Sequence, residues 1–111
     1  MQAFPQLKVI LAHGGYPRVL DAQALVTKHP DFYISPAIYC HFPGGRTYVE
    51  AISMLPDQFI YASAYPLGPI KESAELALNF PLSDDVMEKY MYENAARLLK
   101  LTTAKSKSQV A

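Results

Sequence analysis

The feature of this sequence that most constrains the fold is the segment Leu7–Gly15, in which a short apolar run ends in a histidine and two glycines. Such a run with β-branched members is typical of a strand covered on both faces, and glycines end it because they adopt backbone conformations closed to other residues. Alternate strand residues share a face, so His13 continues the column of Val9 and Leu11. Functional residues of parallel α/β folds gather at the carboxyl ends of strands, so we expect His13 at a functional edge.

The rest of the chain alternates between helical and strand-like segments. Apolar residues at helical spacing predict three helices and a fourth that Ser83 caps, and two aromatic, β-branched runs predict strands. The first predicted helix follows Pro17 and stops at His29, the second runs from about Thr47 to Leu55, the third from about Ile70 to Asn79, and the fourth begins after Ser83. The two further predicted strands are Phe32–Ser35 and Phe59–Ser63. This alternation predicts parallel strands with helical crossovers.

The last predicted helix has the clearest pattern. Two aspartates follow Ser83 at its positive amino end, and Arg97 and Lys100 lie near its negative carboxyl end. Its apolar stripe consists of Val86, Tyr90, Met91, Ala95, Leu98 and Leu99. Residues 102–111 are polar and unpatterned, and we expect a disordered tail without a function of its own.

The composition of the chain is that of one small globular domain and argues against several other classes of protein. Half of the 111 residues are hydrophobic, which is enough for the core of one domain. Ten basic residues balance ten acidic ones, so no net field favours nucleic acid or an anionic membrane, and no run of about twenty apolar residues could span a bilayer. The lone cysteine, Cys40, cannot form an intramolecular disulfide, and the amino terminus lacks the pattern of a secretory signal. We therefore expect a cytoplasmic protein.

Three segments carry a resemblance to a known family: Phe4–Gly15, Phe59–Pro66 and Glu93–Leu99. In this order and spacing they resemble the carboxyl-terminal part of the amidohydrolase-related family, which includes metal-dependent hydrolases and the aminocarboxymuconate-semialdehyde and resorcylate decarboxylases. The resemblance implies an α/β fold, namely a partial (β/α)8 TIM-type barrel with about three parallel strands, crossover helices and a carboxyl-terminal helical segment. The corresponding domain covers residues 1–101.

The resemblance also implies a site. His13 matches a metal ligand of the family, for zinc or manganese, and His41, in the loop after Phe32–Ser35, matches a catalytic, proton-transferring position. Ala64 stands where the family has an aspartate, and a methyl group can neither coordinate a metal nor accept a proton. The early H-x-H or E-x-H metal motif is absent from the sequence, and 111 residues are fewer than the roughly 200–250 of a complete barrel.

These departures leave several functions open. The first is a fragment or shortened family member, inactive in isolation, whose chemistry is metal-assisted hydrolysis or decarboxylation of a small carboxylated substrate. Its partner would be the missing barrel half or a second copy of the chain. The second is a noncatalytic assembly module or degenerate remnant. The third is a small α/β domain that binds an anion at the free backbone amides of Gly14 and Gly15, with the Gly44-Gly45-Arg46 loop as a similar place.

The same residues also fit purely structural roles. A histidine at a strand end can simply bond a carbonyl and hold a loop, which is the alternative for His13, and His41 also fits a partly exposed loop position. Cys40 fits a small buried filler, because free cysteine is often buried. His29, between a lysine and a proline at a helix end, fits a solvated residue. For both glycine pairs we expect solvent-facing turns ahead of anion sites, because neither is a P-loop or a G-x-G-x-x-G motif.

Overall fold

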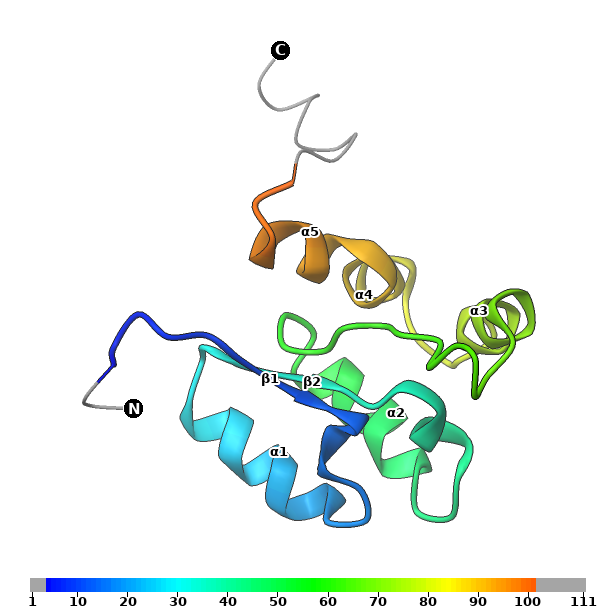
Figure 1. Ribbon diagram of the computed structural model, residues 1–111, viewed down its shortest axis with the longest axis horizontal. Coiled ribbons are helices and arrows are strands. Elements are labelled where there is room, and N and C mark those ends of the chain that lie inside the picture. The colour runs from blue at the N-terminus through cyan, green and yellow to red at the C-terminus, as the bar shows by residue number, and fades with distance from the viewer. Residues whose placement is uncertain (1–3, 102–111) are drawn as a thin grey trace.

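The computed structural model describes residues 4–101, and two parallel strands form its centre. Strands β1 (Val9–Ala12) and β2 (Phe32–Ser35) pair in register, with the first residue of each opposite the other. Helix α1 (Val19–Lys28) connects them, and β1–α1–β2 is the expected strand–helix–strand unit. In Figure 1, α1 and α2 lie on one side of the sheet and α4 and α5 on the other.

The helices follow the predicted pattern closely. Helix α1 ends at Lys28 with His29 as its carboxyl cap, where the stop was predicted, while α2 (Arg46–Met54) and α3 (Ile70–Leu78) begin and end within a residue of the predicted limits. A short 3₁₀ turn follows each strand: η1 (His13–Gly15) after β1 and η2 (Ala37–His41) after β2. The sequence thus predicts where the chain turns at the carboxyl edge of the sheet.

The expected third strand, Phe59–Ser63, contributes only a single position to the sheet. Phe59 forms a parallel bridge with Ile34, whose N–H and C=O bond to the residues on either side of Phe59 at 2.8 and 2.9 Å. The next N–H, that of Tyr61, donates instead to the carbonyl of Tyr90 at 3.0 Å. The ladder ends there because the backbone turns to the carboxyl-terminal helices for its hydrogen bond.

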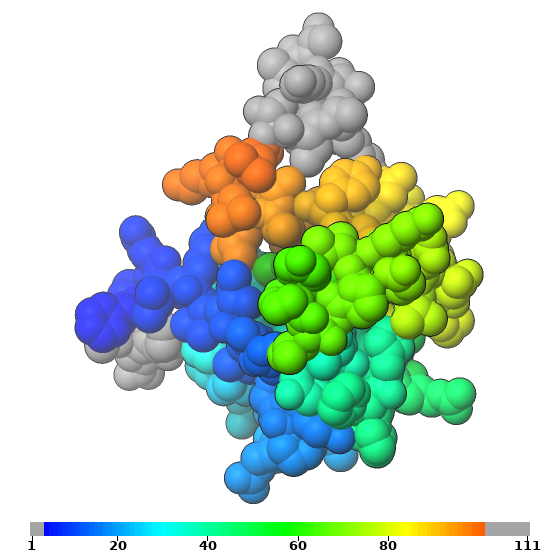
Figure 2. Space-filling model, turned by 45° about the vertical axis from the view of Figure 1, so that its right-hand side comes forward, coloured from blue at the N-terminus to red at the C-terminus, as the bar shows by residue number. Residues whose placement is uncertain are grey.

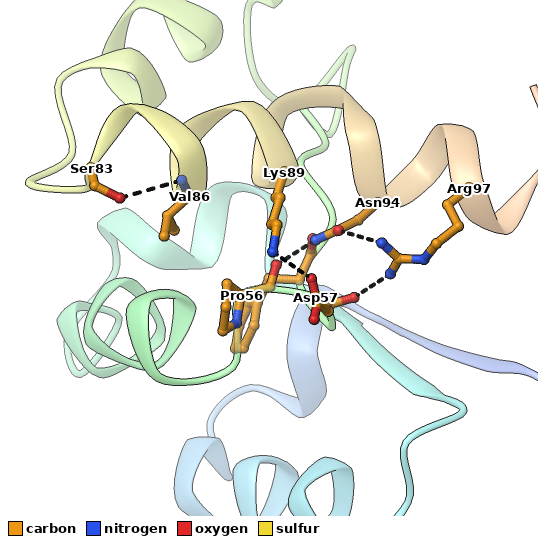
Figure 3. Close-up of polar contacts among 8 residues, drawn as sticks. Pro56, Asp57, Ser83, Val86, Lys89, Asn94 and Arg97 are labelled. Carbon is orange, nitrogen blue, oxygen red and sulfur yellow. Dashed lines mark hydrogen bonds and ion pairs between the residues drawn. The ribbon is translucent and has the colours of Figure 1, made fainter. Parts of the chain in front are cut away.

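The carboxyl-terminal helix is continuous but changes its winding. It comprises α4 (Asp84–Glu88), the π-helical turn η3 (Lys89–Glu93) and α5 (Asn94–Leu98). The Ser83 hydroxyl accepts a hydrogen bond from the Val86 N–H at 3.4 Å, which confirms the predicted cap (Figure 3). The polar tail predicted over residues 102–111 lies outside the described residues.

The core lies between the sheet and the helices. Its fully buried side chains come from every layer: Val26, Ile34, Tyr48, Ile52, Phe59 and Tyr90. Odd-numbered β1 residues pack against this core, which confirms the predicted alternation. Ile10 on the other face is 47% exposed, so the expectation of a strand covered on both faces is wrong, because among residues 4–101 no element covers that face of β1. Among residues 4–101, no helix has the length and apolar character that crossing a membrane requires.

Candidate functional site

The two histidines singled out in the sequence lie at the carboxyl edge of the sheet. His13 begins η1 directly after β1, and His41 ends η2 after β2. Both are exposed, and each packs against a different aromatic ring. The His13 imidazole meets Tyr39 edge to face at 5.3 Å and 88°, whereas His41 lies 5.6 Å from Phe80. The structure therefore places both residues in the turns that follow the two parallel strands, where each ring has its own aromatic neighbour.

The turn that presents His13 has an unusual backbone. His13, Gly14 and Gly15 have φ angles of 61°, 63° and 73°, so three successive residues are left-handed. Glycine adopts this conformation freely, and histidine is among the side chains that tolerate it better than most. The Tyr48 hydroxyl on α2 donates a 2.7 Å hydrogen bond to the Gly14 carbonyl. The strand ends at Ala12, and the left-handed run begins at His13 itself, so the prediction that His13 continues the column of Val9 and Leu11 is wrong. The two glycines continue the turn that ends the strand, as predicted.

An aromatic cluster joins the loops that follow the two strands. Tyr16 stacks on Tyr39 at 4.6 Å and 20°, and Phe42 meets both rings edge on, at 5.8 and 4.8 Å. The Tyr16 hydroxyl donates to the Pro43 carbonyl at 3.0 Å. The His13 ring packs against Tyr39, one member of this cluster. In the sequence Tyr39 follows the predicted strand Phe32–Ser35, but the spacing of the three aromatic residues does not indicate that their rings meet.

Cys40 is a buried filler, as predicted. It is 6% exposed, and burial raises the pKa of its thiol to about 11, with a hydrogen bond to Tyr90 acting in the opposite direction. Burial likewise raises the pKa of Tyr48 to about 12, so its hydroxyl remains a donor in neutral solution. Both groups are neutral near pH 7, and the thiol is not an activated nucleophile.

We expect the Cys40 thiol to react slowly with iodoacetamide in the folded protein. Its thiolate fraction at pH 8 should be about a hundredfold below that of the unfolded chain, because the pKa rises from 9.0 to about 11. Burial makes the pKa of the thiol higher in the folded than in the unfolded chain. Its contribution to the free energy of unfolding is therefore fully present below about pH 9 and is lost as the pH rises toward 11. Mass spectrometry with and without urea measures the difference, and equal rates in both states would contradict the burial.

The described residues do not complete a metal site around His13. Within residues 4–101, no group of three or more histidine, cysteine, aspartate or glutamate side chains is arranged to hold a metal ion. Ala64, which stands where the resemblance implies an aspartate, has a φ of 61°. Aspartate tolerates this left-handed backbone better than alanine does, so the local conformation suits the residue that the sequence lacks.

Two of the predicted solvent-facing glycines are in fact buried. Gly14 lies under the Tyr48 ring, and Gly45 lies under the backbone of Tyr39 and Cys40. The expectation of two open glycine turns is therefore wrong at these positions, because neighbouring elements cover them. An anion has correspondingly little access to the Gly14 side of η1.

Cavities flank this face on the η2 side. One of about 620 Å³ lies between α2 and the turn before α4, lined by Cys40, Arg46, Val49, Glu50, Ser53, Phe80 and Pro81. A much smaller one of about 10 Å³ involves His41, Tyr61 and Ser73. Figure 2 shows how the segment from about residue 60 to 80 lies over the η2 and α2 region. His41 is thus near a covering segment, and His13 lines neither cavity.

Comparisons with known proteins agree on the family and the fold. A family model described as amidohydrolase matches residues 1–101. A TIM-barrel protein of uncharacterised function from Bordetella bronchiseptica is 36% identical, with a TM-score of 0.83 over 89% of this chain and 36% of its own. A comparison with curated proteins finds no match.

Two further solved structures share the fold at lower identity. The 5-carboxyvanillate decarboxylase LigW from Sphingomonas paucimobilis is 23% identical, with a TM-score of 0.65 over 91% of this chain and 36% of its own. A proposed amidohydrolase from Staphylococcus aureus is also 23% identical, with a TM-score of 0.68 over 90% of this chain and 37% of its own. The chain thus spans little more than a third of each barrel protein, and its fold is part of a TIM barrel.

Proposed function

Because the chain belongs to the amidohydrolase family, we propose that it supplies one part of the strand-end wall of an amidohydrolase-type barrel. The proposed chemistry of the assembled barrel is metal-assisted hydrolysis or decarboxylation of a small carboxylated molecule. The observation that carries the proposal is the place of His13, at the carboxyl end of β1, where the sites of such barrels are built. The lone cysteine supports our further expectation of a reducing, cytoplasmic setting.

The roles of the two histidines are part of this proposal. His13 would offer an imidazole nitrogen to zinc or manganese, and His41 would transfer a proton. The exposure of both residues, each in the turn after a strand, supports these roles. The described residues alone do not fit a metal centre. The remaining ligands would have to come from other β/α units.

The free edge of β1 is the place where such units would join. Among residues 4–101, β1 pairs only with β2, and its second edge has no strand beside it. Ile10, 47% exposed, and the preceding Leu7, 48% exposed, leave apolar surface there. An exposed strand edge with apolar neighbours favours pairing with another strand. The proposed occupant is a set of complementary parallel β/α units, because the chain covers 36% of the Bordetella barrel.

A mixing experiment tests the proposal. The purified chain is combined with the part of the Bordetella protein that the chain does not cover, and complex formation is followed by size-exclusion chromatography with light scattering. We expect a one-to-one complex that retains zinc or manganese, and we expect Ile10→Lys to weaken its formation at least roughly tenfold, since a buried unpaired charge is costly.

Matched variants give the controls. Leu20→Lys changes an α1 side chain that is 71% exposed and should leave the complex intact. His13→Ala should lower metal retention without affecting assembly, whereas His29→Ala, at the end of α1, should alter neither. A chain that stays monomeric with the complementary units, or a complex whose metal content ignores His13, would contradict the proposed function.

A further inference from the structure

A buried hydrogen bond reaches the His13 turn from helix α2, which the family resemblance does not single out. Tyr48 lies on α2, 34 residues beyond Gly14 in the sequence, and its side chain is fully buried. Its hydroxyl donates the 2.7 Å hydrogen bond to the Gly14 carbonyl, one residue after His13. A buried carbonyl that loses such a donor pays a desolvation cost, so this bond favours one conformation of the turn.

The shapes of Gly14 and Tyr48 also match. A Cβ atom built on Gly14 would lie 2.8 Å from the Cε1, Cζ and hydroxyl oxygen atoms of the Tyr48 ring. Only glycine therefore lets the ring approach this closely while also adopting the φ of 63° found there. The turn and the ring fit each other through both a hydrogen bond and van der Waals contact.

The backbone of His13 needs such support. A non-glycine residue at a φ of 61° is strained, and strained conformations persist where the surrounding structure holds them in place. Tyr48 donates its hydrogen bond to the buried Gly14, and the Tyr39 ring meets the imidazole edge to face with 5.3 Å between the ring centroids. The orientation of the imidazole thus depends on a residue that does not touch it.

We infer that Tyr48 is a positioning residue for His13, which it holds at the strand end through the Gly14 carbonyl and the packing of its ring against that glycine. The functional meaning of this inference rests on the proposed function of His13. The physical claim concerns the conformation of the turn and is tested without any assay of activity.

Tyr48→Phe removes the hydroxyl and keeps the ring. In NMR spectra we expect the ring-proton signals of His13 to lose the displacement caused by Tyr39 and move toward random-coil values. The Tyr16 amide, which donates to the His13 carbonyl at 3.2 Å, should exchange with solvent roughly fivefold faster or more. His29 and His41 serve as internal references, and their signals should not move.

Tyr33→Phe is the matched control, since Tyr33 is a 6% exposed tyrosine on β2. It should leave the His13 and Tyr16 signals unchanged. The inference is overturned if Tyr48→Phe folds with these signals unaltered, or if both variants alter them equally.

A measurement on the unaltered chain decides the case in which Tyr48→Phe does not fold. In mixed light and heavy water, a slowly exchanging hydroxyl splits the Tyr48 Cζ carbon signal into two, and we expect this splitting. One averaged signal would overturn the inference. Failure of the metal experiment would remove the proposed function but would not change these NMR results, so the two failures are distinguishable.

Discussion

Replacing Asn94 with leucine should lower the free energy of unfolding by about 2–4 kcal/mol, because it leaves two main-chain carbonyls without their donor. The Asn94 side chain is fully buried, and its amide nitrogen donates to the carbonyls of Pro56 and Phe59 at 2.7 and 2.8 Å. Leucine keeps the branched shape of the side chain, and its larger methyl groups add crowding at this buried position to the loss of the two bonds. Urea denaturation followed by circular dichroism measures the loss.

Asn79→Leu provides the control for this prediction. Asn79 also donates its amide to a carbonyl, that of Glu75 at 3.0 Å, but on the exposed end of α3, where water replaces the bond. Its replacement should change the free energy of unfolding by no more than about 0.5 kcal/mol. Equal losses from the two variants would show that burial of the Asn94 bonds contributes nothing.

The bonds of Asn94 matter because they dock the carboxyl-terminal helix onto the segment that leads to the sheet. Figure 3 shows Lys89, Asn94 and Arg97 facing the Pro56–Asp57 turn. Lys89 pairs with Asp57 at 2.9 Å, and Arg97 donates to the Asp57 carbonyl at 2.8 Å. These charged contacts are partly exposed, and such ion pairs add little stability, so the buried amide is the stronger attachment.

The sequence pattern predicts the presence of this helix but not its attachment. Ser83 and the spacing of the apolar residues predict where the helix begins and that Tyr90 is buried. Asn94 lies outside the predicted apolar stripe, and the pattern gives no sign of its two acceptors, which lie 38 and 35 residues earlier. The same limit explains Phe59–Ser63, where β-branched and aromatic residues favour a strand until a long-range bond to Tyr90 ends the ladder.

For the candidate site, too, local features could be predicted from the sequence and long-range contacts could not. The apolar run and the glycine pair are local signals, and they place His13 at the end of a strand. The partners that hold it there, Tyr48 and Tyr39, come from other elements, at separations that periodicity does not encode. Ala64 is likewise visible in the sequence as a departure from the family, while its left-handed backbone is visible only in three dimensions.

Replacing Gly45 with alanine should also lower the free energy of unfolding by about 2–4 kcal/mol, since the added methyl group has no space. Its Cβ would overlap the Tyr39 carbonyl oxygen and lie 2.7 Å from the carbonyl carbon and oxygen of Cys40. All three atoms are main chain, so no side-chain rotation relieves the clash. The Gly45 backbone itself, with φ −68° and ψ −20°, would accept alanine, which leaves crowding as the cause.

Gly44→Ala separates crowding from backbone strain. A Cβ atom on Gly44 meets nothing within 4 Å, but the φ of 80° is left-handed and disfavours alanine by about 1–2 kcal/mol. Urea denaturation should therefore rank Gly45→Ala as the more damaging of two adjacent, chemically identical substitutions. Because the clash pushes η2 away from α2, Gly45→Ala should also displace Tyr39 and alter the His13 ring signals, which Gly44→Ala should leave unchanged. The reverse ranking would contradict the close packing of η2 against the start of α2. It would also contradict the position of Tyr39 against the His13 ring, which depends on that packing.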